Sequence, residues 1–111
     1  MKNFSPKYPL VSVVMNCHNG EKYLKESLNS LKDQTYKNWE LIFVDNFSED
    51  NSYEIFKQAN DKRFNYFRTN RKLKLYHARK IAIKKCRGQY VCFLDTDDLW
   101  KKNKLYYQIN F

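Results

Sequence analysis

The stretch LVSVVMNCHN, residues 10–19, is the strongest indication of the fold, because a largely apolar run, interrupted only by Ser12, ends in Asn16, Cys17, His18 and Asn19. A run that is rich in β-branched residues and apolar on both faces is typical of a buried parallel strand. Shorter or similar runs recur at residues 39–44 (WELIFV), 64–67 (FNYF) and 90–94 (YVCFL). Helical patterns separate these runs, so the chain is predicted to alternate as β-α-β-α-β-α-β-α.

The four predicted helices follow the four strands. Asn19 is the expected N-cap of the first helix, and Asp50 or Ser48 that of the second. Connections of this length predict an α/β fold, with a mostly parallel sheet, right-handed crossovers and helices on both faces. The expected apolar faces comprise Tyr23, Leu24, Ser27, Leu28 and Leu31 in the first helix, Ile55, Phe56 and Ala59 in the second, Leu75, Ala78, Ile81, Ala82 and Cys86 in the third, and Leu99, Leu105, Tyr106 and Ile109 in the fourth.

The composition fits one domain over residues 1–111, with a 42% hydrophobic and 17% aromatic content that supplies a core. The cysteines Cys17, Cys86 and Cys92 include no CxxC pair, and we expect them to be reduced. Residues 1–6 show no signal-peptide pattern, and no apolar run approaches the ~20 residues that span a bilayer. The expected location is the cytoplasm, with the inner face of a membrane as the alternative.

The net charge of +9 is concentrated in one segment. Residues 62–94 hold eleven Lys and Arg and no Asp or Glu, whereas the remainder holds ten basic and twelve acidic residues. Such a segment favours an anionic partner, which leaves nucleic acid, a phosphorylated ligand and an anionic membrane surface open. A solvated basic face explains the same charge equally well.

Polar residues follow three of the predicted strands, and in an open parallel sheet ligands bind beyond these carboxyl ends. Residues 16–19, 45–50 and 95–98 should therefore meet at one edge and form an acidic cluster. Packed carboxylates repel one another unless a cation joins them, and Mg²⁺ or Mn²⁺ prefers oxygen ligands. The Asp-x-Asp of Asp95 and Asp97 is the candidate site for such an ion, although isolated pairs of this kind are more often helix caps or solvated turns.

The third predicted helix begins near the same edge. His77 and Arg79 lie in its first turns and can point toward the site, and a planar guanidinium suits a diphosphate. Lys84, Lys85 and Arg87 lie at its far end, where a solvated face is expected.

Several segments, in this order, resemble family 2 glycosyltransferases. They are residues 11–24 (VSVVMNCHNGEKYL), 34–41 (QTYKNWEL), 44–52 (VDNFSEDNS), 77–80 (HARK) and 88–100 (GQYVCFLDTDDLW), and the similarity extends over residues 10–107. The resemblance implies a Rossmann-like GT-A fold. It also implies metal-assisted transfer of a sugar, with inversion, from a nucleoside diphosphate donor to an unknown acceptor, such as a surface glycan or a lipid-linked sugar.

The resemblance also implies roles by position. Asn16 and His18 would line the base and ribose pocket, Asp45 and Asn46 would contact the nucleoside, Arg79 would stabilise the diphosphate, Asp95 would approach the ribose, and Asp97 would hold the metal. The chain departs from the family at three places. Asn16-Cys17-His18 stands where Pro-Thr-Tyr is common, Asn46 where a second Asp is common, and Lys80 where Asn is usual.

The family's catalytic base and acceptor-binding half come later than Phe111. We therefore expect the fold to be C-terminally incomplete and this chain to bind donor without turning it over. An uncovered apolar surface and an open strand edge would favour self-association.

Three alternatives remain at this stage. A non-catalytic basic nucleic-acid-binding α/β module would use the charge of residues 62–94 and the many aromatic residues. A phospho-acceptor signalling domain has a similar alternation, but it would place paired acids after the first strand. A zinc site from Cys17, His18, Cys86 and Cys92 lacks the close ligand spacing of such sites.

Overall fold

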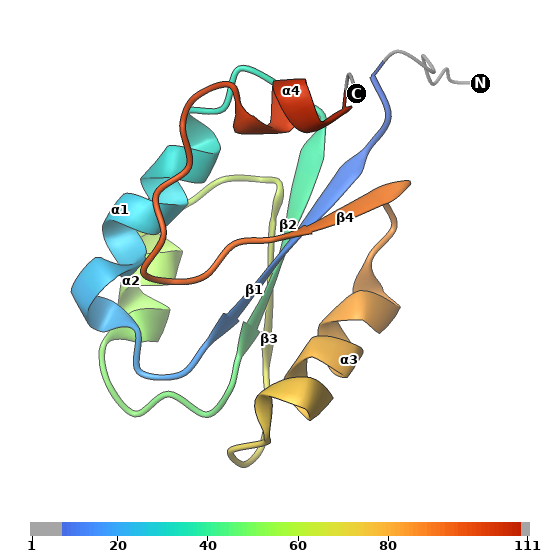
Figure 1. Ribbon diagram of the computed structural model, residues 1–111. Coiled ribbons are helices and arrows are strands. Elements are labelled where there is room, and N and C mark those ends of the chain that lie inside the picture. The colour runs from blue at the N-terminus through green and yellow to red at the C-terminus, as the bar shows by residue number, and fades with distance from the viewer. Residues whose placement is uncertain (1–7, 110–111) are drawn as a thin grey trace.

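A four-stranded parallel sheet forms the centre of the molecule in the computed structural model, which describes residues 8–109 (Figure 1). Its strands are β1 (Val11–Cys17), β2 (Trp39–Asp45), β3 (Phe64–Arg68) and β4 (Tyr90–Phe93), in the spatial order β3-β2-β1-β4. All three pairings are parallel, which confirms the predicted sheet. The carboxyl ends of β1 and β2 lie in register, since Cys17 pairs with Asp45.

Helices cover both faces of this sheet, as predicted. α1 (Glu21–Lys32) and α2 (Ser52–Ala59) lie side by side on one face, and α3 (Leu75–Lys85) lies alone on the other (Figure 1). A short α4 (Lys104–Ile109) follows the last loop and buries Leu105 in the core on the α1 side. Among the helices of residues 8–109, none combines the length and the apolar character that crossing a bilayer requires.

Strand alternation divides the core into two clusters, because successive side chains point to opposite faces of a sheet. Met15 and Phe43 join Leu24, Leu28 and Phe56 beneath α1 and α2. The intervening residues point to α3, where Val14, Ile42 and Val44 pack against Ala78 and Ala82.

The starts of α1 and α2 correct the predicted caps. Gly20, not Asn19, is the N-cap of α1, and Asn51, not Ser48 or Asp50, is that of α2. Asn19 instead adopts a left-handed backbone with φ of 52°, and its side chain accepts a hydrogen bond from the Glu49 amide at 2.8 Å. Asp50 still serves both helix starts, since its carboxylate accepts the Ser52 amide at 2.9 Å and the Glu21 amide at 3.1 Å.

Some residues predicted to be buried are exposed. Leu99 lies in the loop before α4, and Leu75 is half exposed at the start of α3, because this helix packs on the sheet through its two alanines. Tyr90, Val91 and Phe93 are also exposed, because β4 is an edge strand of the sheet.

Candidate functional site

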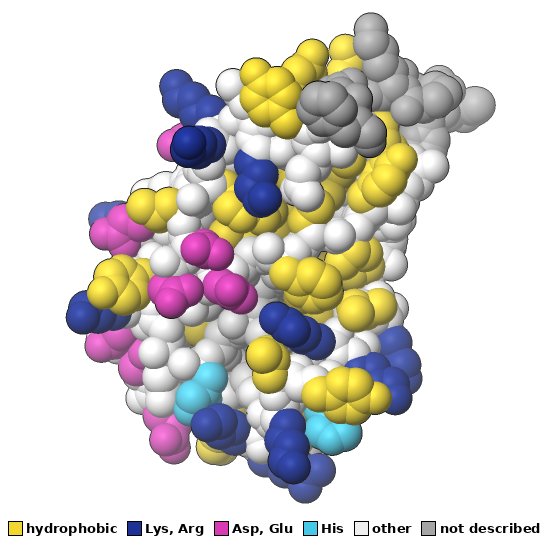
Figure 2. All heavy atoms as spheres, in the orientation of Figure 1, with side chains coloured by type: hydrophobic (Ala, Val, Ile, Leu, Met, Phe, Trp, Pro, Cys, Tyr) yellow, Lys and Arg dark blue, Asp and Glu magenta, His cyan; other side chains and the backbone are white. Residues whose placement is uncertain are grey.

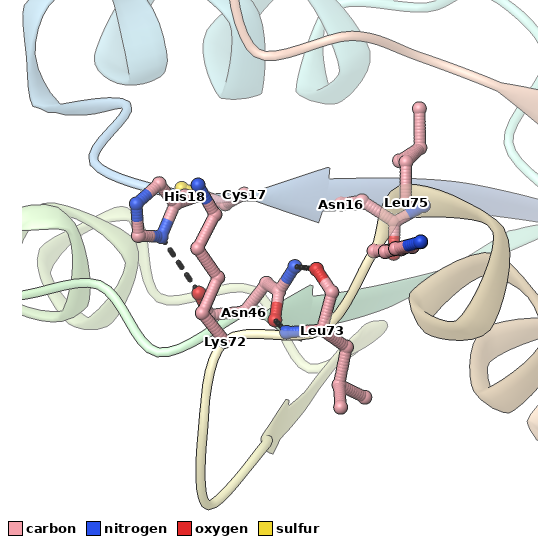
Figure 3. Close-up of a pocket in the computed structure, with 8 residues that line it drawn as sticks. Asn16, Cys17, His18, Asn46, Lys72, Leu73 and Leu75 are labelled. Atoms are coloured by element: carbon pink, nitrogen blue, oxygen red, sulfur yellow. Dashed lines mark hydrogen bonds between the residues drawn. The ribbon is translucent and has the colours of Figure 1, made fainter.

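A cavity of about 550 Å³ opens at the carboxyl ends of β1 and β2 (Figure 3). Asn16, His18 and Asn46 line it together, so the structure brings three of the predicted nucleotide-binding residues to one place, as the sheet edge requires. The opposite wall is the segment 72–75, which leads into α3. The lining residues are Asn16, Cys17, His18, Asn46, Lys72, Leu73, Lys74 and Leu75.

Asn46 ties the two walls of the cavity together. Its side-chain amide donates to the Leu73 carbonyl at 2.7 Å and accepts from the Leu73 amide at 2.8 Å (Figure 3). Its own backbone carbonyl lies 2.8 Å from His18 Nδ1, and its backbone amide donates to the Cys17 carbonyl. Because both ends of the Asn46 side chain are engaged, this residue shapes the cavity through Leu73.

Asn16 lines the cavity and carries an unsatisfied acceptor. Its Oδ1 atom is buried and has no hydrogen-bond partner within residues 8–109. A buried acceptor without a donor is costly, and most such groups in folded proteins find a partner. A ligand N–H or O–H in the cavity could therefore pair with Asn16.

Asp45 points away from this cavity, although it directly precedes Asn46. Its fully buried carboxylate accepts hydrogen bonds from the Tyr66 hydroxyl, from Arg68 Nη1 at 3.2 Å and from the Ser48 amide at 2.9 Å. Burial, together with Asp45, raises the pKa of Tyr66 above its ordinary value, so the phenol remains a hydrogen-bond donor. Arg68 thus supplies the counter-charge of Asp45.

The predicted acidic cluster therefore does not form around Asp45. Within residues 8–109 no three His, Cys, Asp or Glu side chains come together in a way that could hold a metal ion. The same finding rules out, for this part of the chain, a zinc site built from Cys17, His18, Cys86 and Cys92. Burial raises the pKa of each of the three thiols, as is expected of small core residues.

Asp95 and Asp97 lie in the exposed loop after β4. Figure 2 shows acidic side chains gathered over this loop. Thr96 between them is packed inward, since a Cβ atom at Gly20 would lie 3.3 Å from the Thr96 Cβ. The loop backbone is held from beneath, because Ser27 Oγ donates to the Asp95 carbonyl at 3.1 Å.

The two carboxylates have the donor chemistry of a hard-cation site. Neither makes an ion pair or a side-chain hydrogen bond with another described residue, and both face solvent. Mg²⁺ and Mn²⁺ commonly take one or two protein carboxylates and complete their shell with phosphate and water. A pair of exposed carboxylates fits that pattern, whereas an all-protein metal cage does not.

Arg79 lies on α3 beside the end of β4. Its guanidinium carbon is 5.1 Å from the centroid of the Phe93 ring, and Phe93 comes two residues before Asp95. Neither Arg79 nor His77 lines the cavity, and the His77 ring packs edge-on against Tyr76. The guanidinium thus borders the acidic loop rather than the cavity.

Two contributions to this site were not predicted. The backbone of Leu73 carries no sequence signal, because any residue offers the same amide and carbonyl. The contribution of Arg68 did have a sequence signal, because Asp45 and Arg68 carry opposite charges at the ends of two successive strands. These strands pair in parallel, and Asp45 lies opposite Arg68.

Comparisons with known proteins point to one family. The family model for glycosyl transferase family 2 matches residues 12–111. An Escherichia coli relative, the UDP-Glc:alpha-D-GlcNAc-diphosphoundecaprenol beta-1,3-glucosyltransferase WfgD, is 37% identical over 101 residues, which cover 91% of this chain and 40% of that protein. The chain spans about two fifths of the length of the curated relatives it matches first, at 42% and 40%.

Solved structures share the fold. Residues 1–349 of S. aureus TarS superpose with a TM-score of 0.85 at 29% identity, covering 90% of this chain and 31% of that one. TarS has also been solved with UDP and with UDP-GlcNAc. A Pyrobaculum calidifontis mannosyltransferase, solved with GDP-Man and Mn²⁺, has a TM-score of 0.78 at 24% identity, covers 86% of this chain and 30% of that one, and shows the likeness of fold alone. The comparisons give no support to a nucleic-acid-binding module.

Proposed function

This chain belongs to glycosyltransferase family 2, and we propose that it forms the donor-binding part of an enzyme that uses a uridine diphosphate sugar. Family membership rests on the match over residues 12–111, and the GT-A fold on the structural neighbours. The choice of uridine is supported by the E. coli relative, which is named for UDP-Glc, and by TarS, which was solved with UDP and UDP-GlcNAc.

The observation that carries this proposal is the cavity at the strand ends with its unpartnered acceptor. An N–H of the nucleobase would donate to Asn16 Oδ1, and His18 at the rim would contact the ribose. Asn46 would act indirectly, by fixing the Leu73 backbone that forms the far wall. Asp45 would act from still further away, because its carboxylate holds Tyr66 and Arg68 at the end of β3.

The diphosphate would lie between the acidic loop and α3. Asp97 would be the main contact of a Mg²⁺ or Mn²⁺ ion, with Asp95 second and also near the ribose. Such an ion supplies positive charge where the departing diphosphate gains negative charge. Arg79 would add a guanidinium on the other side of the leaving group.

The proposed reaction is a direct displacement with inversion. An acceptor hydroxyl loses its proton to a carboxylate base, and its oxygen forms a bond to the anomeric carbon as the bond to the diphosphate oxygen breaks. No residue of this chain is assigned as that base. The diphosphoundecaprenol acceptor in the name of the E. coli relative supports a lipid-linked sugar as acceptor. We propose that the transfer takes place at the inner face of a membrane.

The test is calorimetric titration of this chain with UDP in the presence and absence of Mn²⁺. We expect Mn²⁺ to strengthen UDP binding, and Asp97→Asn to remove that gain. Asp98→Asn is the matched control, because it removes the same charge from the next residue of the loop and should retain the Mn²⁺ effect. Equal losses of the Mn²⁺ effect in the two variants would show that the loop acts through its overall negative charge and not through a metal contact of Asp97. An absence of UDP binding by the unaltered chain would refute the donor site itself.

A further inference from the structure

We propose that the outer face of α3 binds the surface of an anionic membrane. This face consists of the exposed side chains of residues 71–85, which precede and form α3. Among the elements of residues 8–109, α3 is the one helix on its side of the sheet, and its outer surface is turned away from the rest of the described chain (Figure 1). Figure 2 shows basic and hydrophobic side chains interspersed over this region.

The first observation is uncompensated charge. Of the basic residues in 62–94, Arg63, Arg68 and Arg87 are paired with Asp61, Asp45 and Glu40. The basic residues of the α3 outer face are all exposed and form no ion pair with any described residue. They are Arg71, Lys72, Lys74, Arg79, Lys80, Lys84 and Lys85.

The second observation is exposed apolar area among these cations. Leu75, Tyr76 and Ile83 are 52%, 67% and 49% exposed. Ala78 and Ala82 take the buried side of the helix, and Leu75 borders the cavity, so Tyr76 and Ile83 are the large apolar side chains of α3 that point outward. Tyr76, Lys80 and Ile83 follow one another at spacings of four and three residues and therefore share one helical face.

Anionic lipid matches this combination better than a polynucleotide does. Headgroup phosphates attract Lys and Arg, and apolar side chains at the same level enter the boundary of the acyl layer. Single-stranded nucleic acid is held by aromatic platforms on which bases stack. Of the three exposed apolar side chains of this face, Tyr76 alone is aromatic, whereas Leu75 and Ile83 are aliphatic and offer no such platform.

Docking through this face would have a geometric consequence. Lys72, Lys74 and Leu75 belong both to the α3 outer face and to the wall of the cavity at the strand ends. A membrane against α3 would therefore lie next to the cavity mouth. The proposal itself does not depend on any transferase activity, because it concerns binding to lipid alone.

The experiment uses the purified chain and sedimentation with vesicles of phosphatidylcholine alone or of an equal mixture with phosphatidylglycerol. We expect binding to the mixed vesicles only, weakened by added salt. The double variant Lys80→Glu with Lys84→Glu should weaken that binding by more than about 30-fold, since each basic residue near an anionic surface contributes about fivefold. The double variant Tyr76→Ser with Ile83→Ser should weaken binding to the mixed vesicles by about tenfold, and this loss should persist at high salt.

The matched control is Lys22→Glu with Lys25→Glu, which makes the same charge change on exposed positions of α1, on the other side of the sheet. It should alter vesicle binding by only about twofold, because these side chains lie beyond a Debye length of the bound surface. Circular dichroism melts verify that every variant is folded. Equal losses in the α1 and α3 charge variants, unchanged binding in the α3 variants, or binding to single-stranded DNA but not to mixed vesicles would each overturn the proposal.

Discussion

The two faces of the sheet are built in different ways. Beneath α1 and α2 the core is large and aromatic, with the Phe43 ring centroid 4.4 Å from that of Phe56 and 5.8 Å from that of Tyr66. Beneath α3 the sheet meets a helix through Ala78 and Ala82, and Tyr76 and Ile83 of that helix are exposed to solvent. The first face has the side-chain volume that stabilises a fold, and the second has the open cavity.

Their polar groups differ in the same direction. On the α1 and α2 side, the buried polar groups of Asp45 and Ser48 are satisfied by neighbouring residues, although the indole N–H of Trp39 has no partner within residues 8–109. On the α3 side, Asn16 has an acceptor without a partner and seven cations lack ion pairs within the described residues. One face of this fold therefore provides rigidity, and the other presents groups to ligands, as loops on a rigid scaffold often do.

The largest expected effect tests this contrast in stability. Phe43→Ala should lower the free energy of unfolding by about 3–5 kcal/mol, because it removes a fully buried ring from the aromatic cluster. Ile83→Ala, on the outer surface of α3, should change it by less than about 0.5 kcal/mol. Urea denaturation followed by circular dichroism measures both, and comparable losses would mean that the face beneath α3 is as important for stability as the aromatic one.

Glu40 has a structural role on the α3 side of the sheet. Its buried carboxylate accepts hydrogen bonds from Ser12 at 2.7 Å and from the Arg87 amide and guanidinium at 2.8–3.0 Å. Burial alone would raise the pKa of Glu40, but these hydrogen bonds outweigh it and hold the pKa below the ordinary value.

A depressed folded-state pKa stabilises the protein above the unfolded pKa, and this contribution is lost as the pH falls through the folded value. Glu40→Gln should therefore cost about 2 kcal/mol at neutral pH and flatten the acid side of the stability profile. Urea midpoints from neutral pH down to about pH 3 provide the measurement. A variant with the same acid slope as the unaltered chain would show that Glu40 is not the titrating group.

Asn46 tests whether the cavity wall is held by a side chain. Asn46→Asp removes the donor to the Leu73 carbonyl and sets a carboxylate oxygen against it, which should cost about 1–3 kcal/mol locally. We expect faster amide exchange in residues 71–75 and about tenfold weaker UDP binding. Asn70→Asp, exposed in the same loop and without a hydrogen bond to a described residue, is the control. Unchanged exchange in Asn46→Asp would rule out the tie.

The strands, their parallel direction and the family could be predicted from the sequence, because apolar runs and ordered motifs are local signals. The ends of the helices could not. Asn19 has the chemistry of an N-cap, yet its side chain reaches the Glu49 amide from a left-handed backbone, a contact set by the distant residues 48–50. The orientation of Asp45 also depends on tertiary structure, since strand alternation directs it toward Tyr66 and Arg68 and away from the cavity that Asn46 enters.

Two cations of α3 should differ slightly in their contribution to UDP binding. Arg79 lies beside Phe93, close to the loop of Asp95 and Asp97, whereas Lys84 is five residues further along the helix, about 7.5 Å along its axis. A guanidinium near a diphosphate makes charge-assisted bonds, but a lysine at that separation contributes mainly a screened field. Arg79→Ala should therefore weaken UDP binding by about three- to tenfold, and Lys84→Ala by less than about twofold. Calorimetry at low and high salt separates the two, because only a loss that persists at high salt indicates a direct contact.

Arg79→Lys retains the charge without the planar fork, so an intermediate loss there would assign part of the effect to guanidinium geometry. Equal losses from Arg79→Ala and Lys84→Ala would show that the whole basic face, and not one residue beside the acidic loop, attracts the diphosphate.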